Sequence, residues 1–277
     1  MPHYLQTLDP DLRAALHTQL RDLWTHTSTA LEGNTLTLGD TAFVLREGLT
    51  VAGKPLKDHQ EVVGHARAID LLYEYLAPDR IFGQEDLFTL HKAVQTEAVF
   101  DYYKPVGSWK NEPNSTAGTV DGKQVIFEYA SPAHIPVLME SWFVLYRDWI
   151  EKIEAEPDTT YIADIALTAY VQLHSSFVRI HPFADGNGRL ARLVANLPVL
   201  GAGLPPIIIP REQRKEYIDA LSVWHFAAGQ IKAGEKLLPE PDNLEPFTEL
   251  CRQAWQATIE LVEEVRKRQE ERLTSRN

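Results

Sequence analysis

Residues 181–192 hold the side chains of this sequence that are best suited to chemistry. They read His-Pro-Phe-Ala-Asp-Gly-Asn-Gly-Arg-Leu-Ala-Arg. A Gly-x-Gly turn leaves backbone N–H groups free to bind an anion, because no Cβ blocks the approach. Arginine binds phosphate oxygens through paired hydrogen bonds. The segment therefore predicts a phosphate site beside groups that can move a proton or hold a metal ion.

His181 and Asp185 are the reactive groups of this segment. An imidazole titrates near neutral pH, so His181 is the natural general base. One carboxylate together with substrate phosphates is a usual way to hold Mg²⁺, and Asp185 stands directly before the glycine turn. Phe183 lies between these two residues and is expected to anchor the loop in the core.

A helix is expected to begin after Gly188. Apolar residues recur there at the spacing of a buried helical stripe: Leu190, Leu193, Val194 and Leu197. Arg189, Arg192 and Asn196 fall on another stripe, which we expect to face the phosphate site rather than the core. The N-terminus of this helix would add its own N–H groups to the anion site.

The whole run resembles the signature of the Fic domain, His-x-Phe-x-(Asp/Glu)-Gly-Asn-Gly-Arg-x-x-Arg, with every defined position filled. The resemblance implies a mainly α fold with a small β-hairpin flap. It also implies an enzyme that transfers AMP from ATP to a Ser, Thr or Tyr hydroxyl of a target protein and releases pyrophosphate. In a phosphorylating branch of the family, lysine replaces the second glycine, so Gly188 favours AMP transfer.

The resemblance also assigns roles to single residues. His181 takes the proton from the attacking hydroxyl, and Asp185 holds Mg²⁺ on the α- and β-phosphates. Arg192 binds the γ-phosphate. The remaining phosphate ligands implied by the family are Gly186, Asn187, Gly188 and Arg189.

A second run, Ser28-Thr-Ala-Leu-Glu-Gly-Asn34, resembles the Fic inhibitory motif (Ser/Thr)-x-x-x-Glu-(Gly/Asn). Upstream leucines at near-helical spacing predict a helix, and Gly33 suits the position just past a helix end. Glu32 would then be the last exposed side chain of that helix. The resemblance implies that Glu32 pairs with Arg192 and so blocks productive binding of ATP, with Ser28 and Gly33 completing the motif.

Residues 107–129 are expected to form the flap. Asp121-Gly122 stands between Val120 and the run Val125-Ile-Phe127, which is the pattern of a β-hairpin. The resemblance implies that this hairpin aligns the target protein by strand pairing, a general way to hold an extended peptide.

The adenine pocket matches the family only in part. Tyr217 matches the first of two tyrosines often found on the helix after the signature, but Ile218 occupies the second position and His225 stands where Asn is common. The base specificity therefore stays open among ATP, UTP and GTP. The target protein, self-modification and homodimerisation also stay open.

Two alternatives to inhibited AMP transfer remain. The chain could be a protein de-adenylylase in which Glu32 positions a water, or a nucleotide-sensing module without catalysis. Removing Glu32 distinguishes AMP transfer from de-adenylylation, since it should activate transfer and abolish hydrolysis. The intact His181 argues against a pure sensor, which needs no base.

Composition narrows the class of protein. A net charge of −12 over 277 residues argues against a nucleic-acid surface, and Arg266–Arg268 stand among glutamates on what reads as an exposed helix face. The single Cys251 excludes an intrachain disulfide. The N-terminus lacks the features of a signal peptide and no stretch reaches ~20 apolar residues, so we expect a cytoplasmic protein without a membrane span.

We expect three regions: residues 1–60 with the inhibitory helix, 61–230 as the catalytic core, and 231–277 as a helical extension. The predicted helices lie near 10–32, 60–76, 84–94, 132–152, 160–178, 188–200, 211–227 and 244–273. Pro205-Pro206 should break the chain before a short extended piece at 207–209, and the polar end, 270–277, is expected to fray.

Overall fold

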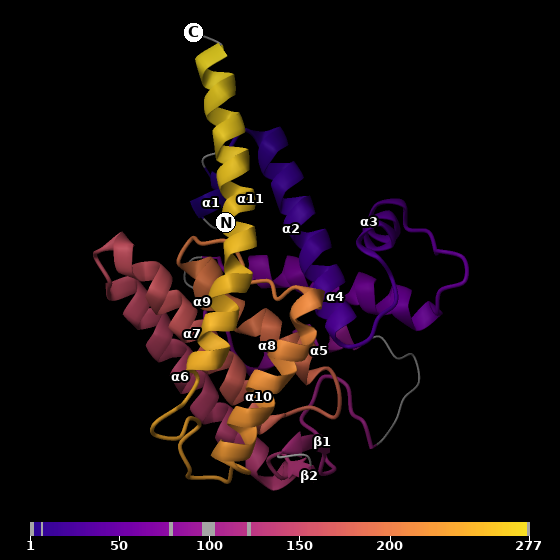
Figure 1. Cartoon of the computed structure of the whole chain (residues 1–277), viewed down its shortest axis with the longest axis vertical. Coiled ribbons are helices and arrows are strands. Elements are labelled where there is room, and N and C mark those ends of the chain that lie inside the picture. Colours follow the sequence, from indigo (N-terminus) through magenta and orange to yellow (C-terminus); the bar gives the residue numbers. More distant parts are fainter. Residues whose placement is uncertain (1–2, 7, 78–79, 96–102, 121–122, 276–277) are drawn as a thin grey trace.

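The computed structural model describes residues 3–6, 8–77, 80–95, 103–120 and 123–275. Helices make up most of this part of the chain, and the sheet in it is a single two-stranded one (Figure 1). In chain order the α-helices are α1 (His3–Gln6), α2 (Pro10–Leu31), α3 (Leu38–Glu47), α4 (Leu56–Glu74), α5 (Gln84–Val94), α6 (Ile135–Ala155), α7 (Thr159–Ile180), α8 (Asn187–Val194), α9 (Asn196–Gly201), α10 (Arg214–Ala228) and α11 (Glu245–Ser275). The strands are β1 (Ser115–Val120) and β2 (Lys123–Glu128), and short 3₁₀ turns lie at Pro132–His134 and Arg211–Gln213.

Helices α7 and α8 form the centre of the molecule and carry residues 181–186 between them. Leu190, Leu193 and Val194 of α8 are fully buried, as their helical spacing predicts. Helix α6 packs against α7, and α2, α4 and α5 pack against α8 (Figure 1). The loop that joins α7 to α8 is therefore mounted on two buried helices, which is a rigid support for a functional site.

The helix predicted at 188–200 is two helices. Helix α8 ends at Val194 and α9 begins at Asn196, two residues before Pro198, which has no N–H to continue the helical ladder. The expectation that Asn196 faces the phosphate site is wrong. Its side chain is fully buried and bonds the N–H and C=O of Ile207 at 2.8 and 3.0 Å, so it holds the extended piece 207–209 against the helix break.

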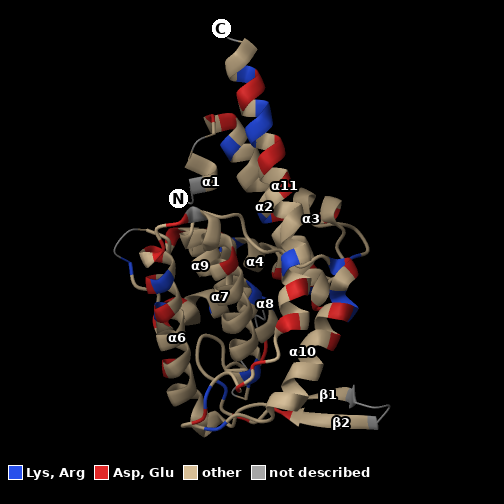
Figure 2. Ribbon diagram, turned by 60° about the vertical axis from the view of Figure 1, so that its left-hand side comes forward, with Lys and Arg blue, Asp and Glu red and all other residues tan. Residues whose placement is uncertain are grey.

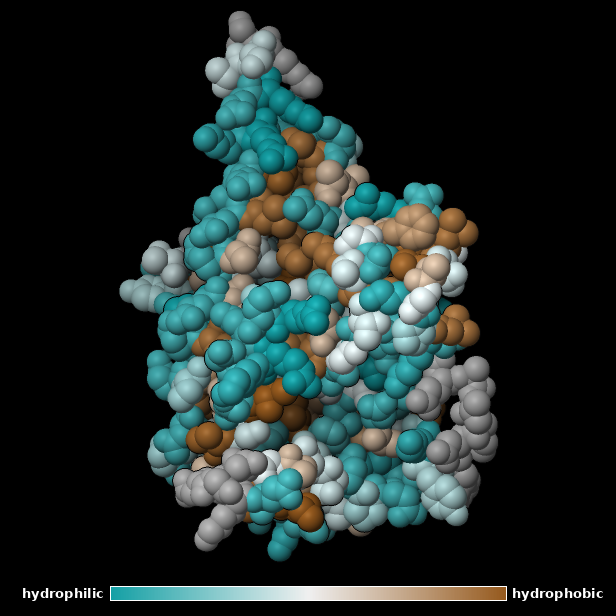
Figure 3. Space-filling model, turned by 45° about the vertical axis from the view of Figure 1, so that its right-hand side comes forward, coloured by the Kyte–Doolittle hydropathy of each residue, from teal (hydrophilic) through white to brown (hydrophobic). Residues whose placement is uncertain are grey.

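The C-terminal helix is longer than expected, and the prediction that 270–277 fray is wrong for the described part of that segment. Helix α11 continues to Ser275, and its C-terminal half lies beside α2 (Figure 1). Arg272 pairs with Asp11 at 2.8 Å, and Gln269 accepts a hydrogen bond from the Asp9 N–H at 2.9 Å. Mixed charges cover this end of α11 (Figure 2), and apolar side chains gather beside it (Figure 3).

Two helices were not expected from the sequence, the four-residue α1 and helix α3. Helix α3 begins with a capping box, in which the Thr37 hydroxyl accepts from the Asp40 N–H and the Asp40 carboxylate accepts from the Thr37 N–H. It ends at Gly48, which has the left-handed conformation of a helix stop.

The predicted hairpin is present. Strands β1 and β2 pair antiparallel, with Ser115 opposite Glu128 and Ala117 opposite Ile126. The turn residues 121–122 lie outside the described part of the chain. Phe127 of β2 is buried and stacks on His225 of α10 with ring centres 5.2 Å apart, so the hairpin is fixed to α10 (Figure 2). None of the described helices is both long enough and apolar enough to cross a membrane.

The buried amide of Asn196 gives a test of the helix break. Asn196→Ala should lower the free energy of unfolding by about 2 kcal/mol, because the N–H and C=O of Ile207 would lose their partners in the core. Urea unfolding of the variant against wild type measures this loss, with the exposed Gln253→Ala of α11 as control. Equal stability of Asn196→Ala and wild type would contradict the role assigned to the amide.

Candidate active site

His181 lies at the C-terminal end of α7 in a left-handed conformation, with φ of 56°. Few non-glycine residues adopt this backbone geometry, and it turns the chain sharply out of the helix. Its Nδ1–H donates to the Val178 carbonyl at 3.2 Å, which leaves Nε2 as the basic nitrogen. Burial, with help from the nearby Lys110 ammonium, lowers the pKa of His181 to about 3, so the imidazole is neutral at working pH.

The loop after His181 is closed by the side chain of Asn187. Its Oδ1 accepts from the Phe183 N–H at 2.9 Å and its Nδ2 donates to the Phe183 carbonyl at 2.8 Å. The Phe183 ring is fully buried and stacks on His91 of α5 at 3.9 Å. The amide of Asn187 is thus engaged within the loop, and Phe183 ties the loop to the core.

Asp185 points its carboxylate to the surface side of the loop, with a side chain that is 53% exposed. Oδ1 accepts from the Gly186 N–H at 2.7 Å, while Oδ2 lies 3.7 Å from Arg189 and 3.5 Å from the Gln95 amide. Burial opposes ionisation of this carboxyl, but Arg189 and the Gly186 N–H lower its pKa below the ordinary value. Asp185 is therefore an ionised carboxylate, open on one side, at the start of α8.

Arg189 is buried and is fixed by α5 and α4. It donates to the Val94 carbonyl at 3.0 Å and to the Gln95 side chain at 3.4 Å, and it lies 3.8 Å from the Glu61 carboxylate. Its guanidinium is thus held at the N-terminal end of α8 beside Asp185. Positive charge and helix N–H groups converge at this point, as expected of an anion site.

Arg192 is 2% exposed and reaches from α8 to the end of α2. Its Nε and Nη2 donate to the hydroxyl and the carbonyl of Ser28 at 3.0 and 2.8 Å. Nη2 also forms an ion pair with Glu32 Oε1 at 2.6 Å. The structure therefore brings together the two sequence motifs, which lie 160 residues apart.

The Glu32 carboxylate lies directly over the glycine turn. A Cβ added to Gly188 would stand 2.5 Å from Glu32 Oε1, a distance that real Cβ atoms do not show. Gly188 thus leaves the space that a carboxylate oxygen occupies in this structure. The same space at the first turn of α8 suits an oxygen of a phosphate group.

The end of α2 is held by several other elements. Gly33 follows Glu32 with φ of 101° and ends the helix, and Arg214 of α10 donates to the Leu31 carbonyl at 2.8 Å. Asn34 donates to the Asp58 carbonyl and to Glu61, both at 2.9 Å. Glu61 therefore contacts both the segment after Glu32 and Arg189.

Tyr217 lies beneath this ion pair. Its hydroxyl accepts from Arg192 Nη1 at 3.1 Å and also contacts His174 Nε2 at 3.1 Å. The side chain is buried, and burial raises the pKa of the phenol. Tyr217 thus supports Arg192, while the role in an adenine pocket stays a prediction.

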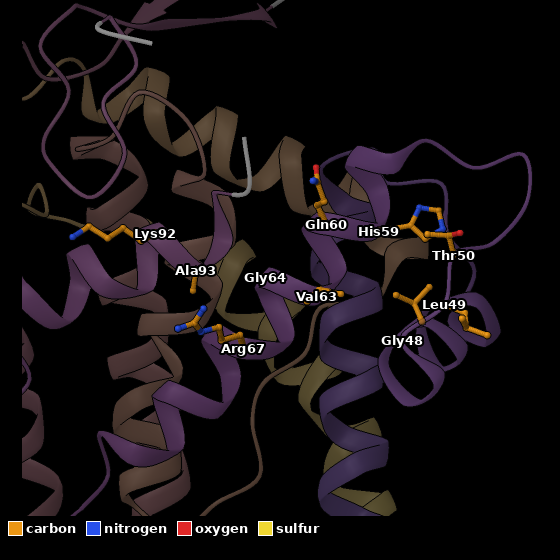
Figure 4. Close-up of a pocket in the computed structure, with 11 residues that line it drawn as sticks. Gly48, Leu49, Thr50, His59, Gln60, Val63, Gly64, Arg67, Lys92 and Ala93 are labelled. Carbon is orange, nitrogen blue, oxygen red and sulfur yellow. The ribbon is translucent and has the colours of Figure 1, made fainter. Parts of the chain in front are cut away.

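A surface pocket of 460 Å³ is lined by other residues (Figure 4). Helices α4 and α5 and the turn after α3 line it, with Val63, Arg67 and Lys92 among its side chains. None of the site residues predicted from the sequence belongs to it. The candidate active site is therefore the loop at 181–192 with its contacts, and not this pocket.

Several residues near the loop carried no signal in the sequence. His91 donates from Nε2 to the Asp185 carbonyl at 3.2 Å and accepts from the Gly107 N–H at 2.9 Å. Tyr129 stacks on His181, and Lys110 and Asn114 bond the loop. These three residues lie within the predicted flap, and only that place could have drawn attention to them.

Comparison with known proteins finds a Fic domain in this chain. Residues 81–199 match the model of the Fic/DOC family. Protein adenylyltransferase fic-1 of Caenorhabditis elegans is 32% identical over 212 residues, which are 76% of this chain and 38% of that protein. Protein adenylyltransferase Fic of Drosophila willistoni is 29% identical over 237 residues, 84% of this chain and 40% of the relative. The chain thus spans about two fifths of the length of these curated relatives.

The fold is also that of solved Fic proteins. A Fic domain containing signaling protein from Bacteroides thetaiotaomicron VPI-5482 superposes with a TM-score of 0.74 at 28% sequence identity. The match covers 94% of this chain and 92% of that one.

Gly188→Ala tests the contact between Glu32 and the glycine turn. Alanine in place of glycine in a helix stabilises by about 1 kcal/mol, but here its Cβ must displace the carboxylate. We expect no gain in the free energy of unfolding in wild type and a gain of about 1 kcal/mol in the Glu32→Ala background, a coupling of that size between the two sites.

Gly39 provides the matched control, because it holds the same second position in α3 that Gly188 holds in α8, and a Cβ there would meet only the Thr37 hydroxyl, at an ordinary contact distance of 3.9 Å. Gly39→Ala should give the same change in both backgrounds. An equal effect of Gly188→Ala in both backgrounds would show that Glu32 does not occupy the turn in solution.

Proposed function

Because this chain carries a Fic domain, we propose that it is a protein adenylyltransferase, which transfers AMP from ATP to a Ser, Thr or Tyr hydroxyl of a target protein. The observation that carries the proposal is the loop at 181–192, where a neutral imidazole, an ionised carboxylate and two buried arginines meet at one helix N-terminus. The curated relatives named protein adenylyltransferase support it.

In the proposed reaction, His181 Nε2 accepts the proton of the target hydroxyl as its oxygen attacks the α-phosphorus. A new bond forms between that oxygen and phosphorus, and the bond to the β-phosphate oxygen breaks, so pyrophosphate leaves. The hydrogen bond from Nδ1–H to Val178 supports this role, since it fixes the ring and keeps Nε2 free to accept.

The anion site would hold the triphosphate. Arg189 and the N–H groups at the start of α8 face the same point, and Arg192 would bind the γ-phosphate. Asp185 fits an Mg²⁺ ligand, because it is ionised, half-exposed and next to the phosphate position. Bound Mg²⁺ would neutralise phosphate charge. A lysine at position 188 would collide with Glu32, and its absence supports AMP transfer over phosphoryl transfer.

We infer that Glu32 inhibits the enzyme. Its carboxylate takes one N–H of Arg192 and stands at the glycine turn, where it would repel a phosphate and occupy its space. Relief requires that α2 or the Glu32 side chain withdraw from Arg192. The 41% exposure of the Glu32 side chain supports relief by a movement of that side chain.

The target protein would dock on the hairpin β1–β2. Both strands are edge strands of a two-stranded sheet, and such strands can pair with an extended peptide. Tyr129 follows β2 and stacks on His181 at 3.7 Å, so a peptide on the hairpin would lie close to the base.

Glu32→Gly should raise AMP transfer about tenfold or more, because the carboxylate no longer competes with phosphate for Arg192, and a tenfold change corresponds to only about 1.4 kcal/mol. His181→Ala in the same background should abolish it. The measurement is transfer of label from α-labelled ATP with Mg²⁺ to the protein itself and to a cell lysate, with γ-labelled ATP run in parallel.

Glu47→Gly, at the exposed end of α3, is the matched control and should behave as wild type. Label from both positions of ATP would indicate phosphoryl transfer. No label in any lane would overturn the proposal and favour removal of AMP from a modified protein, in which case Glu32→Gly should lose the hydrolysis that wild type shows.

A further inference from the structure

A buried lysine lies next to the catalytic loop and is not used in the reaction above. Lys110 is 3% exposed, which is rare for a lysine. Its backbone N–H donates to the Pro182 carbonyl at 2.9 Å, and its Nζ donates to Asn114 Oδ1 at 2.5 Å. Asn114 in turn donates to the Phe183 carbonyl at 3.0 Å. The segment 110–114 therefore bonds two successive residues of the loop that follows His181.

Tyr129 joins this lysine to the base. Its ring stacks on the His181 imidazole, with centres 3.7 Å apart and planes inclined by 12°. Lys110 Nζ lies 5.9 Å from the centre of the same ring. The ring thus fixes the plane of the imidazole, and the ammonium is held on the side of the loop where His181 lies.

Four titratable groups face His181 from different elements. Lys110 comes from the segment before β1, His225 from α10, Asp185 from the loop itself, and Tyr129 from the end of β2. Burial lowers the pKa of His225 to about 3, and burial raises that of Tyr129 to about 12, so both are neutral. Burial lowers the pKa of Lys110 to about 7, so the lysine is an ammonium below pH 7. Among these four groups Lys110 supplies the positive charge.

We propose that Lys110 is a positioning residue of the transfer reaction, whose ammonium opposes protonation of His181 and whose bond with Asn114 holds the loop. This inference rests on the proposed function. A nucleotide triphosphate bound beside His181 brings several negative charges, which favour the protonated imidazole. A protonated imidazole cannot accept the proton of the target hydroxyl. The buried ammonium of Lys110, close to the Tyr129 ring that stacks on His181, opposes this effect of the phosphates.

The charge of Lys110 and the hydrogen bond of Asn114 are expected to affect the dependence of kcat on pH differently. Glu32→Gly/Lys110→Met removes the charge but keeps the backbone bond to Pro182, so the acid limb of kcat against pH should move up by about one pH unit. Lys110→Arg should keep the limb in place. Glu32→Gly/Asn114→Ala should lower kcat without moving the limb, because it removes a loop bond and no charge. Lys152→Met, on the exposed face of α6, is the control for loss of a lysine.

The sign of the shift follows from the charges. Removal of a nearby cation favours the imidazolium, so the pKa of His181 rises and the neutral form is lost at a higher pH. The profiles are measured in the Glu32→Gly background with saturating ATP and Mg²⁺ from pH 3 to pH 8, a range that includes the pKa of His181 of about 3 and its expected rise. An acid limb that stays in place in Lys110→Met would overturn the role of the charge, and so would a limb that moves equally in Asn114→Ala.

A second measurement needs no activity. The imidazole resonance of His181 is followed by NMR through a pH titration of wild type and Lys110→Gln, which keeps a hydrogen-bonding side chain and loses the charge. The midpoint should be higher in Lys110→Gln, and an equal or lower midpoint would refute the proposal. Because this titration does not depend on AMP transfer, failure of the proposed function and failure of the Lys110 inference are distinguishable.

Discussion

A single buried guanidinium joins the parts of this site. Arg192 is almost inaccessible to water, and a charge in that position is costly unless hydrogen bonds and a counter-charge surround it. Its partners come from two other helices: Ser28 and Glu32 lie at the end of α2, and Tyr217 lies on α10, so Arg192 of α8 joins three helices. Withdrawal of Glu32 would leave Ser28 and Tyr217 in place as neutral hydrogen-bond partners of Arg192. The buried positive charge would then lack a counter-charge, which favours binding of another anion. A phosphate that enters this place meets an arginine whose direction is already fixed.

The loop before Arg192 is held in shape by hydrogen bonds from buried side chains to its backbone. His181 leaves α7 in a left-handed conformation, and Asn187 closes the turn on the backbone of Phe183. His91 and Asn114 then bond the carbonyls of Asp185 and Phe183 from two other segments. His181 and Asp185 are therefore positioned by buried side chains that bond the loop backbone, which is how a short loop can hold several polar groups in a fixed arrangement.

The sequence predicts the central helices and the signature loop because both depend on local patterns. Helical spacing of apolar residues locates α7, α8 and α10, and glycine and asparagine locate the turn. The hairpin is predicted by its turn residues and its alternation. Other features depend on contacts between distant segments, and they were missed or misread. The spacing of Asn196 suggests an exposed helix face, but in the fold Asn196 bonds Ile207. The polar sequence of residues 270–275 suggests a frayed end, but in the fold Arg272 pairs with Asp11. Lys110 and His91 have ordinary local sequence, and only burial against the loop gives them a role.

The end of α2 carries an electrostatic conflict that bears on how Glu32 leaves. The carbonyl end of a helix has partial negative charge, and α2 places an acidic residue there with no basic residue in its own last turn. Arg214 and Arg192, from other helices, compensate this negative charge. Arg214 donates to the Leu31 carbonyl, and Arg192 bonds the Ser28 carbonyl and the Glu32 carboxylate. If a phosphate takes Arg192, the carboxylate loses its partner at the helix end that disfavours it most, and it moves into solvent. Binding of the anion and displacement of Glu32 thus favour one another, while the bonds of Asn34 to Asp58 and Glu61 let the helix end keep its place. On this argument, movement of the Glu32 side chain suffices for exchange, and α2 need not unfold.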